Sequence, residues 1–282
     1  MLAFFSISVG LWGNFRQLWL QDNNFSVTSI SNIISIGTLI SVIVIAFIAK
    51  YIKLDKLKNA LVIVILIKFI NIFLLCFLNG TSFIGLIRLL VIIDIITEFI
   101  TITSIYPLIT TMLKSETIYS KRRLTEYLFR DIGILFGGVF IGKSIAGVII
   151  NYNICLFIAN IFLICSLFVL VNIKITNISN NEEYKKISSK YIFKDKLLIL
   201  YLIYMLIGTI AMSTALGLKM LTLTNYFKFS DSVATNYLLV IGLLADIFGI
   251  IALKYLTPKN DYLTITIKFG IRFLGYVIAF VS

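Results

Sequence analysis

The sequence predicts an all-α fold class, a polytopic membrane bundle of helices, and two observations support that prediction. Hydrophobic residues make up 60% of the 282 residues and charged residues 13%, at a mean hydropathy of +1.02. A soluble domain is roughly half apolar and about a quarter charged. In addition, residues 23–49, 144–173 and 197–218 contain no charge, and each run exceeds the roughly 20 apolar residues that cross the hydrocarbon. We therefore expect the lipid bilayer to surround the chain.

Nine helical spans account for the apolar stretches. Polar or basic segments set their limits, because a charged side chain inside the hydrocarbon is unfavourable. The expected spans are 2–20, 27–49, 60–78, 83–106, 127–149, 152–173, 197–218, 232–253 and 262–281.

Basic residues between the spans give the expected orientation. The segments that follow even-numbered spans hold seventeen Lys and Arg residues, whereas the segments on the opposite side hold two. Cytoplasmic loops of membrane proteins carry the excess of basic residues. The sequence therefore predicts a multi-pass protein of the plasma (inner) membrane with a cytoplasmic N-terminus.

The longest polar stretch divides the chain. Residues 174–196 are rich in Asn, Ser, Lys and Glu, and we expect them to form a cytoplasmic linker. This linker separates an N-terminal six-helix transmembrane bundle, residues 1–173, from a partial C-terminal bundle of three helices, residues 197–282. A weak internal repeat supports the division, because the order of residue types over residues 25–59 recurs over residues 229–260.

Composition argues against several function classes. Histidine is absent, which removes the commonest zinc ligand and the commonest general base. The three cysteines lie in apolar runs without metal-ligand spacing. The net charge of +12 is spread over loops, whereas nucleic-acid binding needs a contiguous basic face. The sequence therefore predicts no catalytic residues, no metal, no cofactor and no nucleic-acid partner, and we expect that the protein is not an enzyme.

A nucleotide-binding string occurs in span five. Residues Gly137 to Ser144 satisfy the pattern G-x-x-x-x-G-K-[ST]. That loop needs a strand before it and a helix after it, whereas this string lies inside an apolar span. We therefore expect no nucleotide. Gly138, Gly142 and Ala146 recur every four residues, and such a stripe is typical of close helix packing in lipid.

Charges inside the expected spans are the main functional signal, because they are costly in lipid and mark solute or ion pathways. Span four contains Arg88, Asp94 and Glu98. The two acids are four residues apart and share one helix face, about 6 Å apart along the axis. Two carboxylates this close favour reversible proton binding. Arg88 is expected nearer the outer side, where it would attract an anion or neutralise an acid.

Further candidates lie in other spans. In span five, Asp131 is expected at the level of Glu98 and Lys143 at the level of Arg88. Arg16 either lines a cavity or extends to the outer interface. Lys68 is expected to extend to an interface. The candidates for the solute or proton pathway outside span four are thus Arg16, Asp131, Lys143 and Asp246.

Three local stretches are similar to motifs of one transporter family, the major facilitator superfamily. Residues 46–55 stand where its basic loop between spans two and three would be, although the family's glycines and acid are replaced. Arg88 matches the arginine of span four in its drug exporters. Span five has the glycines of its antiporters but not their proline; these are Gly133, Gly137, Gly138, Gly142 and Gly147.

The layout as a whole also resembles that superfamily, whose members have two six-helix bundles and a cytoplasmic linker. The chain is similar to spans one to nine of a twelve-span member, so we expect a truncated chain or one completed by another chain. The resemblance implies secondary active transport of a small solute by alternating access, with protons as a candidate coupling ion. The alternative is a non-transporting or truncated membrane subunit. An integral membrane enzyme or lipid-handling protein is less favoured.

Overall fold

The computed structural model describes residues 1–13, 15–52, 54–78, 83–113, 118–140, 144–145, 148–149, 151–173, 199–200, 203, 221–231, 233–241 and 244. The chain divides into two compact units. The first comprises Met1–Ile178 and Leu218–Leu243, and the second comprises Ser179–Gly217 and Leu244–Ser282. Nearly all described residues belong to the first unit, which holds the fold and the site described below.

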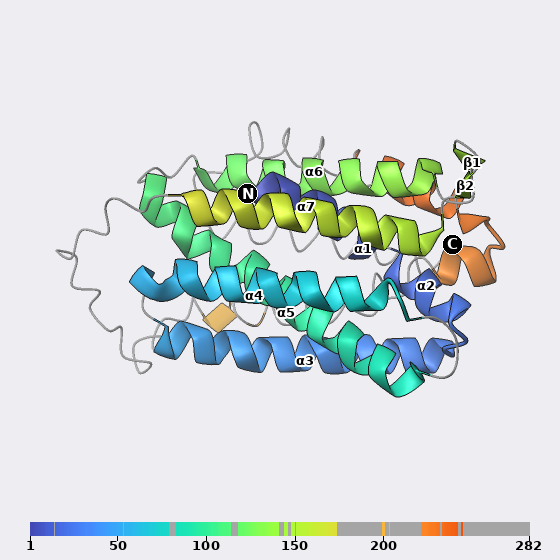
Figure 1. The fold of residues 1–282 in the computed structure, drawn as a ribbon, viewed down its shortest axis with the longest axis horizontal. Helices are drawn as coiled ribbons and strands as arrows, with labels where there is room; N and C mark the ends of the chain where they lie inside the picture. The colour runs from blue at the N-terminus through green and yellow to red at the C-terminus, as the bar shows by residue number, and fades with distance from the viewer. Residues whose placement is uncertain are drawn as a thin grey trace. The chain divides into compact units, whose positions relative to one another are not determined.

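The first unit is built of helices that follow one another with short connections (Figure 1). Each helix corresponds to a predicted span except that the first span is divided in two. The helices are α1 (Leu2–Gly13), α2 (Arg16–Asp22), α3 (Val27–Tyr51), α4 (Leu54–Leu75), α5 (Ile84–Leu113), α6 (Ile118–Phe140) and α7 (Tyr152–Asn172). A π-helical turn, η2 (Thr222–Tyr226), precedes helical residues 233–241.

The packing order differs from the chain order. α1 packs between α6 and α7, α7 packs on α4, and α4 packs on α5, which in turn packs on α3 (Figure 1). Three described helices are long and apolar enough to cross a membrane, and their spanning segments are Val27–Ile48, Lys56–Leu75 and Tyr152–Asn172. The membrane prediction is therefore confirmed at this level.

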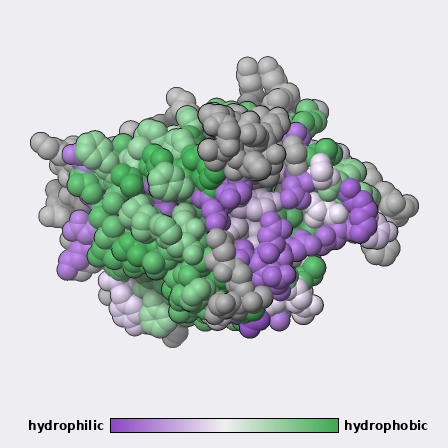
Figure 2. All heavy atoms as spheres, turned by 45° about the vertical axis from the view of Figure 1, so that its right-hand side comes forward, coloured by the Kyte–Doolittle hydropathy of each residue, from purple (hydrophilic) through white to green (hydrophobic). Residues whose placement is uncertain are grey.

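Large apolar side chains cover the outer faces of these helices. Phe47 on α3 and Phe168 on α7 are 58% and 70% exposed, and Phe77, just after α4, is 69% exposed. Figure 2 shows hydrophobic residues covering a broad area of one face and hydrophilic residues gathered in a separate area. An apolar surface of this extent is unfavourable in water but suits contact with lipid chains.

Helix ends are fixed by polar side chains. The Ser26 hydroxyl accepts a hydrogen bond from the backbone of Ser29 at the start of α3, and Asn151 does the same for Ile154 at the start of α7. Both satisfy backbone N–H groups that a helix leaves free at its first turn. At the opposite end of α7, Lys58 Nζ donates to the carbonyls of Val171 and Ile173 at 2.9 and 2.6 Å. A cation at this position also complements the helix dipole.

Glycines bring α1 and α6 into backbone contact. A Cβ atom placed on Gly10 would lie 2.1 Å from the carbonyl oxygen of Arg130 and 3.1 Å from the Cα of Gly133. A Cβ on Gly137 would lie 2.3 Å from the Phe15 ring. Close helix packing in span five thus occurs at Gly133 and Gly137. Neither glycine belongs to the predicted stripe of Gly138, Gly142 and Ala146.

The structure corrects two predicted spans. The first is not continuous, because α1 ends at Gly13 and α2 begins at Arg16. The fifth, 127–149, begins earlier and ends at Phe140, after which β1 (Ser144–Ile145) and β2 (Val148–Ile149) form a short antiparallel pair. The prediction of a helix over residues 144–149 is therefore wrong. Gly142 and Ala146 lie outside the described residues.

Candidate functional site

The break between α1 and α2 places two polar side chains inside the apolar helix block. The Phe15 N–H donates to the Trp12 carbonyl at 3.1 Å, so the helical turn tightens there. Trp12, at the end of α1, and Arg16, at the start of α2, are both buried. The Arg16 guanidinium carbon lies 5.9 Å from the centre of the Trp12 ring, which is within range of a cation–π interaction.

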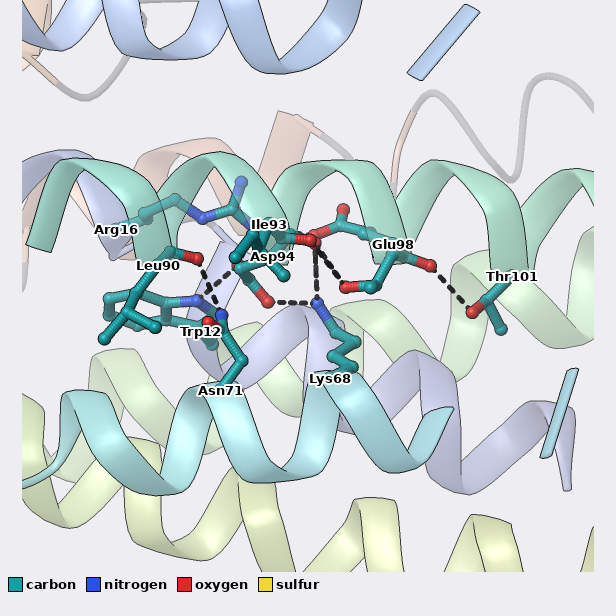
Figure 3. Close-up of polar contacts among 10 residues, drawn as sticks. Trp12, Arg16, Lys68, Asn71, Leu90, Ile93, Asp94, Glu98 and Thr101 are labelled. Atoms are coloured by element: carbon teal, nitrogen blue, oxygen red, sulfur yellow. Dashed lines mark hydrogen bonds and ion pairs between the residues drawn. The ribbon is translucent and has the colours of Figure 1, made fainter. Parts of the chain in front are cut away.

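Four charged side chains meet at this break, and we call them the charge cluster (Figure 3). Arg16 comes from α2, Lys68 from α4, and Asp94 and Glu98 from successive turns of α5. Lys68 and Asp94 are fully buried, whereas Arg16 and Glu98 are 7% and 9% exposed. Two positive and two negative side chains therefore lie together among mainly apolar residues of these helices.

The contacts within the charge cluster connect every cation to every acid. Arg16 Nη2 lies 3.0 Å from Asp94 Oδ2 and 2.6 Å from Glu98 Oε2. Lys68 Nζ forms a short ion pair with Asp94 Oδ1 and lies 3.7 Å from Glu98 Oε2. Both acids thus share the same two cations.

The two acids differ in how firmly they are held. Each Asp94 oxygen has a partner, because Lys68 contacts Oδ1 while Arg16 and the indole N–H of Trp12, at 2.7 Å, contact Oδ2. Among the described residues, Glu98 is contacted at one oxygen only, and its side chain is 12% exposed against 0% for Asp94. Asp94 is therefore a fixed anion, whereas Glu98 is the acid that can exchange partners.

Uncharged polar groups support the cluster from its two flanks. Asn71, one turn after Lys68 on α4, donates its amide to the Leu90 carbonyl of α5 at 2.7 Å. The Thr97 hydroxyl donates to backbone carbonyls of its own helix, and the Thr101 hydroxyl donates to the Thr97 carbonyl at 2.7 Å. These bonds keep the polar side chains of α5 satisfied within an apolar environment.

Charge balance explains how this cluster can be buried. Moving one ion out of water costs several kcal/mol, and only well-placed opposite charges and hydrogen bonds offset that cost. Removing one partner of such a set costs about 3–5 kcal/mol because a buried charge is left uncompensated. The helix block therefore accommodates these charges as a balanced set, and the loss of any one of them leaves another uncompensated.

The structure separates the predicted site residues. It brings Arg16, Asp94 and Glu98 together, but Arg88 lies apart, exposed, donating to Ser29 Oγ at 3.1 Å. Asp131 is buried on α6, and none of the contacts between described residues joins it to the cluster. Lys143 and Asp246 lie outside the described residues.

Two members of the site are not identifiable as such from the sequence. The expectation that Lys68 extends to an interface is wrong, because its side chain pairs with Asp94 inside the block. Trp12 belongs to a predicted apolar span, yet its indole holds Asp94. The charge of Lys68 within span three is the available signal, but its partner is 26 residues away on another helix.

A second polar region, which we call the end contacts, lies where α2 ends and α7 begins. Gln21 donates to Asn225 Oδ1 at 3.1 Å, and the Tyr152 hydroxyl donates to Asp231 Oδ2 in a short hydrogen bond. These bonds tie residues 225–231 to the helix block. Burial and the nearby carboxylate of Asp231 raise the pKa of Asp22, which lies beyond the predicted span.

Neither region has the composition of a metal centre, since no group of three potential ligands occurs among the described residues. Comparison of the chain with protein-family models, curated proteins and solved structures finds no match. The site must therefore be interpreted from its own chemistry.

Proposed function

We propose that the protein is a secondary active transporter of a small solute, and that the solute path passes the charge cluster. The observation that carries this proposal is the burial of four balanced charges between α2, α4 and α5, of which α4 is long and apolar enough to cross a membrane. Ionisable residues inside such helices pair with one another and mark solute or ion pathways. A purely structural block of this kind is built more simply from apolar residues.

The break beside the cluster supports the same function. Discontinuous helices leave backbone groups free near the middle of many transporters, and solutes bind there. The break between α1 and α2 lies directly beside Arg16, whose side chain bridges both acids. A solute that binds at Arg16 therefore competes with an acid, and this competition links binding to a change in helix packing.

Proton coupling is part of the proposal and is assigned to Glu98 rather than Asp94. Asp94 has three partners and no exposure, whereas Glu98 has one contacted oxygen and some exposure. A proton that binds Glu98 releases its contact with Arg16 and leaves the pair of Lys68 with Asp94 intact. Glu98 is thus suited to alternate between the proton and Arg16.

The layout proposed is that of the major facilitator superfamily, with an N-terminal six-helix bundle followed by the helices of a second bundle. The excess of basic residues in the segments after even-numbered predicted spans supports a cytoplasmic N-terminus. With that orientation the end contacts lie on the outer side. Rocking of the bundles would then open the end contacts on the outside and the opposite helix ends on the inside.

A transport assay with mixed solutes tests the function although the solute is unidentified. The full chain is reconstituted into liposomes, and these are incubated with glucose, lysine, alanine, lactate and inorganic phosphate under an inward proton gradient. Retained solutes are identified by mass spectrometry. Accumulation of at least one solute above protein-free liposomes supports transport, and Arg88→Gln serves as the matched control outside the cluster. If none of these solutes is taken up, with or without a proton gradient, the transport proposal is wrong and the alternative of a non-transporting membrane subunit is favoured.

A further inference from the structure

Arg16 uses only part of its hydrogen-bonding capacity. Its contacts with Asp94 and Glu98 are both made by Nη2, whereas Nε is buried and has no acceptor among the described residues. A guanidinium carries five N–H donors, and a buried donor without an acceptor is unfavourable. The side chain is 9% exposed, so bulk water does not supply that acceptor freely. Arg16 therefore retains room for one more acceptor.

The charge sum of the cluster limits which solutes can use this donor. Arg16 and Lys68 balance Asp94 and Glu98, so an added anion leaves one negative charge uncompensated inside the helix block. A cation would leave one positive charge uncompensated, and Arg16 offers it no acceptor. An anion can be accommodated if one acid is neutralised at the same time.

Glu98 is the acid placed to be neutralised. It faces Arg16 of α2 and Lys68 of α4, with Asp94 one turn away on its own helix. The neighbouring helix α3 has no charged residue over positions 27–49, and Asp131 of α6 is joined to Glu98 by none of the described contacts. The single contacted oxygen of Glu98 makes its release from Arg16 the smallest change that the cluster allows.

Resting on the proposed transport function, we propose that the solute is a small monovalent oxyanion, a carboxylate or a phosphate, that binds Arg16 while a proton binds Glu98. The oxyanion accepts hydrogen bonds from Arg16, including the unused Nε, in place of the Glu98 carboxylate. Arg16 and Lys68 then balance Asp94 and the solute, and the charge sum remains zero. One proton accompanies one anion, so transport is electroneutral.

Gly13 lies beside this position. A Cβ atom on Gly13 would lie 3.7 Å from Arg16 Nη2 and 3.9 Å from Glu98 Oε1, both ordinary contact distances. Alanine therefore fits the structure as it stands, and its methyl group would lie beside the contact between Arg16 and Glu98 that the oxyanion is proposed to replace. Gly13→Ala is expected to retain the fold and to weaken oxyanion uptake.

The same liposomes test the proposal when they contain a pH-sensitive dye. Lactate and inorganic phosphate are added separately, and so are glucose and lysine, with protein-free liposomes as the control for passive entry of the undissociated acid. We expect lactate, phosphate or both to acidify the interior, at a rate independent of membrane potential. If glucose or lysine is the solute that accumulates, or if anion entry depends on membrane potential, this inference is wrong although transport itself stands. If no solute accumulates, both proposals are wrong.

Variants of Arg16 and Glu98 test whether oxyanion uptake depends on the charge cluster. Arg16→Gln should reduce oxyanion uptake at least about tenfold, the loss that one charge-assisted hydrogen bond entails. Because this change leaves the acids in excess, the double variant Arg16→Gln with Glu98→Gln keeps the charge balance and should show the same loss. Glu98→Gln alone should bind lactate, which stays ionised across neutral pH, with an affinity that does not depend on pH, measured by a thermal shift. Uptake by the folded double variant equal to that of Arg88→Gln would overturn the proposal.

Discussion

The charge cluster and the end contacts are two polar regions of one helix block, and they differ in charge balance. The cluster pairs two cations with two acids between apolar helices, and its members are almost completely buried. The end contacts include the hydrogen bond from Tyr152 to Asp231, and the carboxylate of Asp22 lies close enough for Asp231 to raise its pKa; no cation takes part in the contacts that the structure describes there. The comparison teaches that the deeply buried cluster matches its charges, whereas the like charges of Asp22 and Asp231 lie at a helix end where a proton can compensate them.

The largest expected effect comes from unbalancing the cluster. Asp94→Asn removes the acid that holds Lys68 and should lower the free energy of unfolding by about 3–5 kcal/mol. Thermal unfolding in detergent, followed by circular dichroism, measures the loss. The double variant Asp94→Asn with Lys68→Met restores the charge balance and should recover most of it. A loss no greater than that of Arg88→Gln would show that charge balance does not stabilise this region.

A smaller effect should follow from moving α1, which carries Trp12 into the cluster. Gly10→Ala places a methyl group 2.1 Å from the carbonyl of Arg130, so the helices must separate. Overpacking of this kind costs about 1–3 kcal/mol. Gly85→Ala is the matched control, because a Cβ atom there meets nothing within 4 Å. Equal melting temperatures for the two variants would contradict the close contact between α1 and α6.

The end contacts should respond more weakly than either. Tyr152→Phe removes the donor to Asp231 and should cost about 1 kcal/mol, the net value of one hydrogen bond. Tyr226→Phe is the matched control, since Tyr226 is 79% exposed. Thermal unfolding of the two variants measures this difference, and we expect only Tyr152→Phe to lower the midpoint temperature. A shift as large as that of Asp94→Asn would reverse the ranking of the two regions.

The smallest expected effect is the pH dependence of the end contacts. Burial and Asp231 raise the pKa of Asp22 above its ordinary value of 3.8, so the folded protein binds this proton more tightly than the unfolded chain does. Stability from this group is therefore present at low pH and is lost as the pH rises through these pKa values. Solvent screening keeps the effect small. Melting temperatures measured from pH 3.8 upward should decrease as the pH rises, and Asp22→Asn should make them less dependent on pH. An Asp22→Asn variant with the same pH dependence as the original chain would show that Asp22 is not the group responsible.

Helix positions in the first unit could be predicted largely from the sequence. The predicted spans 27–49 and 152–173 agree closely with α3 and α7. Their limits follow from apolar runs and from capping residues such as Ser26 and Asn151, which act locally. The break after Gly13 was not predicted, although Gly13, Arg16 and Gln17 interrupt the apolar run there, because polar residues within a span also occur without a break in the helix.

The pairing within the site was only partly predictable. The spacing of Asp94 and Glu98 places both on one face of α5, as predicted from the helical repeat. The same repeat gives no information about which face of α4 meets them, so Lys68 could not be assigned to the site. Likewise, Arg88 lies on the same helix as the acids but on an exposed position beside Ser29.

The sequence by itself determined that apolar helices form, which stretches of the chain form them and which charges they carry, because hydropathy and helical periodicity are properties of neighbouring residues. Only the tertiary structure decided that these charges cancel. Arg16 and Glu98 are 82 residues apart and Lys68 and Asp94 are 26 apart, so their contact depends on how α2, α4 and α5 pack and rotate against one another. Interdigitation of side chains on neighbouring helices sets that packing, and no single helix contains the information.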